Sequence, residues 1–84
     1  MKYTVIWRPS AEQALTSIWL AARDRSAVTS ASSGIEIALQ LNPNNVGESR
    51  SSGRRIMFIY PLAVIFRVIK KDMQVRVLKV WRFG

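Results

Sequence analysis

The sequence predicts an α+β domain of two layers, in which a helical hairpin packs on a mostly antiparallel four-stranded sheet. Three observations predict this class. Apolar residues recur at helical spacing in two stretches of the first half, and β-branched and aromatic residues dominate the C-terminal third. A further short β-rich run precedes the helices, which gives the order β-α-α-β-β-β. We expect residues 1–84 to form a single domain.

The first strand and the first helix are predicted from the opening residues. Residues 3–8 are β-branched and aromatic, and Pro9 ends the strand. Ser10 is the predicted helix N-cap, with Gln13 three residues later completing a capping box. The helix then presents an apolar stripe, formed by Ala11, Ala14, Leu15, Ile18, Trp19 and Ala22.

A second helix is predicted between Asp24, the next N-cap candidate, and Asn42-Pro43, where the proline disfavours helix. Residues 42–53 are rich in turn-forming types and form the predicted long loop. The apolar stripe of the second helix consists of Val28, Ala31, Ile35, Ala38 and Leu39. Three strands follow the loop, over residues 54–60, 62–70 and 73–82.

The last two strands are predicted to form a hairpin with a two-residue turn at Lys71-Asp72. This turn fixes which residues face each other, and it separates the hairpin into two faces. The apolar face, expected beneath the helices, pairs Val68 with Val75, Phe66 with Val77 and Val64 with Lys79. The other face pairs Ile69 with Gln74, Arg67 with Arg76, Ile65 with Leu78 and Ala63 with Val80, and Arg82 extends it. Because two arginines lie opposite each other there, this second face is the candidate functional surface.

The positive charge is concentrated in the second half of the chain. Residues 43–84 contain nine Lys and Arg against two acids, a net charge of +7 within a total of +8. A basic surface built on a sheet indicates a polyanionic or acidic partner. Cysteine and histidine are absent, so disulfides and Cys/His metal sites are excluded, and we expect neither a metal nor another cofactor. Without an apolar run long enough to span a bilayer or a signal peptide, the expected location is the cytoplasm.

Several stretches together resemble the RelE/ParE toxin superfamily of type II toxin–antitoxin systems, whose members are often described as plasmid stabilisation proteins. The residues that carry the resemblance are Tyr3 to Glu12, Leu15 to Trp19, Ile35 to Leu39 with Asn42-Pro43, Gly53 to Ile56, Leu62 to Val68 and Val75 to Val80. The resemblance implies a cognate antitoxin as partner. It also implies one of two cellular targets, which are DNA gyrase for ParE-like members and mRNA on the ribosome for RelE-like members.

The residues of the RelE-like nucleases transfer only in part. An arginine early in the penultimate strand of that branch corresponds to Ala63, whereas a later basic residue is matched by Arg82. The C-terminal aromatic or histidine that could act as a general base has no match, since Phe83 cannot transfer a proton. The resemblance therefore favours a toxin that binds a target such as gyrase. A metal-independent endoribonuclease acting on the ribosome and a non-toxic nucleic-acid-binding protein remain the alternatives.

The candidate site consists mainly of arginines, because a guanidinium binds phosphate or carboxylate through its planar fork. The candidates for binding the target are Arg54, Arg67, Arg76 and Arg82, and Arg54 and Arg55 alternate between the two faces of their strand. If the chain is a nuclease, Arg67, Arg76 and Arg82 would contact the phosphate and Glu48 would be the candidate base. The alternative interpretation is that the arginines are solvated and that Glu48 forms a salt bridge with Arg50.

Overall fold

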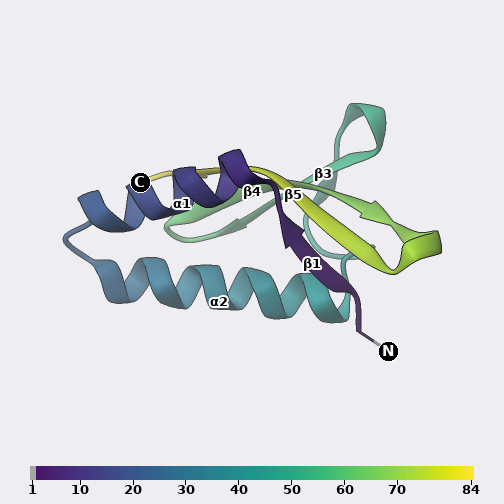
Figure 1. Ribbon diagram of the computed structural model, residues 1–84, viewed down its shortest axis with the longest axis horizontal. Coiled ribbons are helices and arrows are strands. Elements are labelled where there is room, and N and C mark those ends of the chain that lie inside the picture. Colours follow the sequence, from purple (N-terminus) through teal and green to yellow (C-terminus); the bar gives the residue numbers. More distant parts are fainter. Residues whose placement is uncertain (1) are drawn as a thin grey trace.

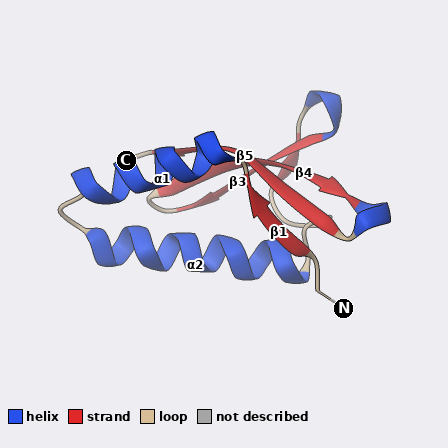
Figure 2. Ribbon diagram, viewed as in Figure 1, coloured by secondary structure: helices blue, strands red, loops and turns tan. Residues whose placement is uncertain are grey.

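The computed structural model describes residues 2–84 and confirms the two-layer α+β architecture (Figure 1). The main elements are β1 (Thr4–Trp7), α1 (Pro9–Ala21), α2 (Arg25–Leu41), β2 (Glu48–Ser49), β3 (Arg54–Ile59), β4 (Leu62–Ile69) and β5 (Gln74–Arg82). The strands form one sheet in the order β1-β5-β4-β3-β2, with β1 parallel to β5 and the other pairs antiparallel. The two helices run antiparallel to each other as a hairpin (Figure 2).

The sheet has five strands rather than the predicted four, because the two-residue strand β2 lies within the predicted loop. Glu48 and Ser49 pair with Ile56 and Arg55 of β3. Arg55 holds this segment in place, since its guanidinium donates hydrogen bonds to the carbonyl oxygens of Val46 and Gly47 and to the Ser49 hydroxyl oxygen. The side-chain hydrogen bonds of Arg55 thus add to the strand pairing in holding a stretch with few apolar residues at the edge of the sheet.

The helix starts differ from the sequence prediction. Arg8, rather than Ser10, occupies the N-cap position of α1, and Pro9 is at the first helical position. A proline is suited to that position because its φ is already helical and its missing N–H would have had no helical partner. Asp24 is the N-cap residue of α2 as predicted, but its side chain makes no capping hydrogen bond. Its carboxylate is bound instead to Arg82.

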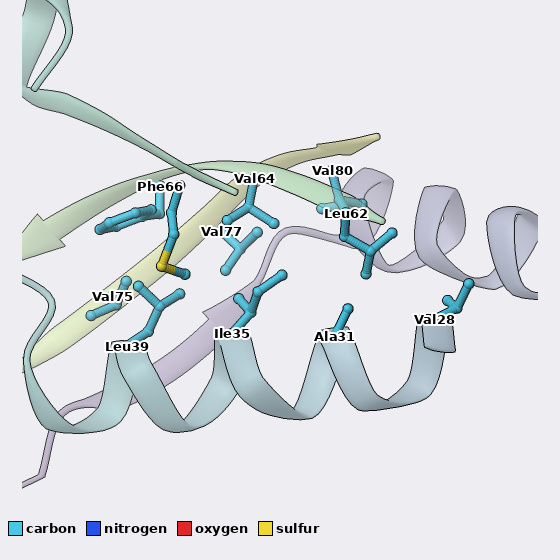
Figure 3. Close-up of a cluster of buried hydrophobic side chains, with 12 residues drawn as sticks. Val28, Ala31, Ile35, Leu39, Leu62, Val64, Phe66, Val75, Val77 and Val80 are labelled. Carbon is cyan, nitrogen blue, oxygen red and sulfur yellow. The ribbon is translucent and has the colours of Figure 1, made fainter. Parts of the chain in front are cut away.

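The core lies between α2 and one face of the sheet, which we call the helix face (Figure 3). The apolar stripe of α2 is buried as predicted, through Val28, Ala31, Ile35 and Leu39. The sheet contributes Met57, Leu62, Val64, Phe66, Val75, Val77 and Val80. Trp19 lies outside this core with 39% of its surface exposed, and its indole N–H donates to the Thr29 hydroxyl. Neither helix within residues 2–84 is both long and apolar enough to cross a membrane.

The hairpin between β4 and β5 confirms part of the predicted register and corrects the rest. Near the turn, Arg67 pairs with Arg76, Val68 with Val75 and Phe66 with Val77, as predicted. A β-bulge then leaves Leu78 unpaired, so that Ile65 pairs with Lys79, Val64 with Val80, Ala63 with Trp81 and Leu62 with Arg82. The predicted pairs Val64–Lys79, Ile65–Leu78 and Ala63–Val80 are therefore wrong, because one extra residue in a strand shifts every later pair.

The bulge also exchanges the two faces of β5 beyond Leu78. Val80 joins the core with only 7% of its surface exposed, whereas Lys79 lies on the opposite face, which we call the open face. Arg82 shares its side of the strand with Val80 and so lies on the helix face, not on the open face as predicted. The turn itself has four residues rather than two, with Lys70–Asp72 in a 3₁₀ turn and Met73 in the left-handed region at φ 51°.

The different burial of two phenylalanines of the sheet predicts a large difference in what each contributes to the free energy of unfolding. Phe66 is completely buried in the core, and Phe66→Ala should lower the free energy of unfolding by about 3–5 kcal/mol. Phe58 is 52% exposed on the open face, so Phe58→Ala is the matched control and should cost about 1 kcal/mol through its edge-to-face contact with Phe83. Urea denaturation of both variants measures the difference, and equal losses would contradict the assignment of the two faces.

Candidate functional site

Three arginines lie side by side on the open face of the sheet. Arg54 of β3 is the register partner of Arg67 in β4, and Arg67 is the register partner of Arg76 in β5. We call these three residues the arginine row. Ile6 of β1 is the next residue across the sheet, because it pairs with Arg76. Sequence-predicted site residues from three strands are therefore brought together in one line across the sheet.

The arginine row forms part of the lining of a groove of about 380 Å³. Apolar side chains from three strands form much of the rest of its lining, and Pro9 at the start of α1 also contributes. Besides the arginine row, the lining residues are Ile6, Trp7, Arg8, Pro9, Ile69 and Leu78. None of these residues carries a carboxylate, an imidazole or a phenol. The groove can therefore bind an anion, but the residues that line it supply no general base for proton transfer.

The positive charges of the arginine row are not neutralised within the described part of the chain. The two ion pairs among residues 2–84 are Arg50–Glu48 and Arg82–Asp24, and neither involves the row. Arg67 is oriented by a hydrogen bond from its Nη2 to the carbonyl oxygen of Ser52, at 2.9 Å. Like charges on directly opposite residues of a sheet repel each other, and a bound anion relieves that repulsion. The arrangement is suited to carboxylate or phosphate groups.

Arg82 is the predicted site residue that the fold removes from this surface. Its guanidinium makes two hydrogen bonds to the Asp24 carboxylate, from Nη1 to Oδ1 at 2.9 Å and from Nη2 to Oδ2 at 2.8 Å. These bonds connect the end of β5 to the turn between the helices. The hydrogen bonds from Arg82 hold the pKa of Asp24 below its usual value, and those to Asp24 raise the pKa of Arg82.

Glu48, the predicted candidate base, lies in β2 at the far edge of the sheet and is not among the residues that line the groove. Its carboxylate is exposed and accepts a hydrogen bond from Arg50 Nη1 at 3.2 Å. Arg54 and Arg55 alternate as predicted. Arg54 lines the groove, whereas Arg55 is not among the lining residues and forms hydrogen bonds to Val46 and Ser49 of the neighbouring segment.

Sequence reasoning missed four members of the groove, which are Ile6, Trp7, Arg8 and Pro9. All four lie in β1 or directly after it, far along the chain from the arginine row. They reach the groove because β1 pairs in parallel with β5, at the edge of the sheet. The alternation of β1 places Ile6 and Arg8 on one face, but the sequence contains no signal for the neighbour of β1 in the sheet.

Comparison with known proteins identifies the fold. No family model and no curated protein matches the sequence. A chain of the toxin–antitoxin complex RelBE2 from Mycobacterium tuberculosis superposes with a TM-score of 0.79 at 18% identity, over 98% of this chain and 92% of that chain. The chromosomal ParDE system from P. aeruginosa gives a TM-score of 0.76 at 18% identity, over 98% and 97% of the two chains.

The chain has the RelE/ParE toxin fold. A mutant of the E. coli toxin RelE in the free state agrees with this, with a TM-score of 0.67 at 13% identity over 98% of this chain and 84% of that chain. The resemblance drawn from the sequence is thus confirmed at the level of fold. In this chain, the open face of the sheet carries the arginine row and the helix face carries the Arg82–Asp24 pair.

The Asp24–Arg82 pair predicts a pH dependence of stability. The pKa of Asp24 is lowered in the folded protein. Its ionised carboxylate therefore contributes to the free energy of unfolding at pH values above the pKa of an unfolded aspartate, which is about 4. That contribution is lost as the pH falls through the lower, folded pKa. Asp24→Asn should therefore reduce stability at pH 7, and the difference from wild type should vanish in strong acid.

The control for this experiment is Asp72→Asn, which removes a carboxylate that has no ion pair within residues 2–84. Thermal unfolding at a series of pH values compares the two variants with the wild type. If Asp24→Asn and Asp72→Asn change stability equally at every pH, the pair does not connect β5 to the helical hairpin in solution.

Proposed function

We propose that this protein is the toxin of a type II toxin–antitoxin pair. In the resting state a cognate antitoxin binds it, and after release it acts by binding a cellular target such as DNA gyrase. The observation that carries the proposal is the arginine row, in which three cations without carboxylate partners among residues 2–84 lie in a groove whose lining residues include no general base. Such a groove is suited to binding an acidic or anionic surface rather than to proton transfer.

The fold supports the partner that we propose. The solved structures of RelBE2 and ParDE with which this chain superposes belong to toxin–antitoxin systems. An antitoxin segment with acidic residues would neutralise the arginine row, and its apolar residues would bury Ile6, Ile69 and Leu78 in the groove. Burial of these apolar side chains would keep part of the affinity at high salt, since salt screens only the charge interactions.

A ribosome-dependent endoribonuclease is the second candidate, and the row of cations is the feature that favours it, because phosphate is also a ligand of arginine. Three observations weigh against it. Ala63, which corresponds to the strand arginine of the nucleases, is fully buried and pairs with Phe58 and Trp81 on the open face. Arg82 is paired with Asp24 on the helix face, and Glu48 lies outside the groove.

The first functional prediction is that the protein inhibits growth when it is expressed and that this effect depends on the arginine row. Expression of the wild-type chain should arrest growth, and co-expression of the neighbouring gene should relieve the arrest. Arg76→Ala should abolish or strongly reduce the arrest while changing the free energy of unfolding by less than about 0.5 kcal/mol, because Arg76 is exposed. Lys79→Ala is the matched control, since it removes an exposed cation of the same face outside the row.

If Arg76→Ala melts many degrees lower and yet stays fully toxic, the arginine row is structural and the proposal fails. The proposal also fails if the wild-type chain leaves growth unchanged and does not co-purify with the product of its neighbouring gene.

The second functional prediction separates the two targets. Primer extension on cellular mRNA after induction should show no strong, discrete cuts, because the groove offers no base and lacks the nuclease arginine at Ala63. The loss of one preorganised charge donor typically reduces such catalysis by about 100- to 1,000-fold. A supercoiling assay with purified gyrase should show inhibition by the wild type and a weaker effect of Arg76→Ala. Codon-positioned cuts in mRNA would instead establish the endoribonuclease.

A further inference from the structure

The direction of the arginine row restricts what can bind to it. Arg54, Arg67 and Arg76 lie on three neighbouring strands, so the row runs across the strands and not along one of them. Adjacent strands are separated by about 4.8 Å, and Ile6 continues the line onto β1. The surface therefore presents three cations and then one apolar side chain, at roughly equal steps.

An α-helix that lies across the strands can match these steps. Side chains at positions i, i+4 and i+7 share one face of a helix, with neighbouring Cβ atoms about 5–6 Å apart. In an extended segment, the residues of one face are about 6.8 Å apart, which exceeds the strand spacing. A helix with acids at these positions therefore places one carboxylate near each arginine, whereas an extended segment loses the alignment with each step.

We propose that an acidic helix of the antitoxin crosses the open face, with acids at i, i+4 and i+7 over the arginine row and an apolar residue at i+11 over Ile6. This inference rests on the proposed function, since the helix belongs to the partner assigned there. The sides of the groove support it, because Ile69 and Leu78 offer apolar contacts to the residues that flank an acidic stripe. Arg67, at the centre of the row, is already oriented by the Ser52 carbonyl.

Two synthetic helical peptides of identical composition test the pattern against the intact protein. One carries three glutamates at i, i+4 and i+7 and a leucine at i+11, and the other distributes the same residues around the helix. Fluorescence anisotropy at low salt should show that the patterned peptide binds about tenfold more tightly. Arg76→Ala should weaken its binding by about three- to tenfold, and Lys79→Ala should leave it unchanged.

Exchanging the charges of one arginine and its peptide partner tests how the helix is aligned on the row. Because binding should be lost and then restored in the same protein variant, the result does not depend on the stability of that variant. Arg76→Glu should abolish binding of the patterned peptide, and a peptide with lysine in place of the glutamate at i+7 should restore it. A peptide with lysine at i should not restore binding, because that position lies over Arg54 at the other end of the row. Restoration at i+7 alone supports the crossing helix, whereas equal restoration at both positions overturns it.

Equal affinity of the two peptides would also overturn the inference, and so would a single-stranded RNA oligonucleotide that displaces the patterned peptide and binds more tightly. These failures differ from a failure of the proposed function. Growth arrest that the neighbouring gene relieves would persist if the antitoxin bound by another geometry, and it would be absent if the chain were not a toxin.

Discussion

The pairing of β4 with β5 determines which side chains the protein buries and which it presents. Both strands lie inside the sheet, flanked by β1 and β3, and they supply much of the core as well as two of the three arginines of the row. Their register places Phe66 and Val77 on the helix face and, one residue closer to the turn in each strand, Arg67 and Arg76 on the open face. Since the side-chain period of a strand is two, a slip of one residue would exchange core and surface.

The β-bulge at Leu78 inserts one residue into β5, so that the residues beyond it exchange the two faces of the sheet. Before the bulge, β5 presents Arg76 on the open face, and after it Val80 and Arg82 lie on the helix face. The bulge therefore divides the basic residues of one strand between two roles. Arg76 remains without a carboxylate partner within residues 2–84, whereas Arg82 connects the strand end to Asp24 in the turn between the helices.

The two faces of the sheet have different roles, so a small domain can hold several like charges on one face and still fold. The helix face carries the apolar side chains that stabilise a chain of 84 residues, for which the margin of stability is narrow. The open face carries like charges that repel each other in the free protein. An anion bound at the row would relieve this repulsion, so the repulsion in the free protein would favour formation of the complex that we propose.

The sequence by itself determined the local features of this protein. Hydrophobic periodicity predicted both helices and the three C-terminal strands, and the turn at Lys71-Asp72 predicted that Arg67 lies opposite Arg76. These features depend on residues close together in the chain, so propensity and spacing are sufficient to predict them. The resemblance to RelE/ParE toxins rested on the same order of elements.

Only the tertiary structure decided the composition of the site. The strand order placed Ile6 beside Arg76 and brought Arg8 to the same groove, and the pairing of β3 with β4 added Arg54 to the row. The bulge moved Arg82 away from that face. The pairing of β1 with β5 joins segments distant in sequence, and the alternation of side-chain types along β5 does not encode the extra residue at Leu78.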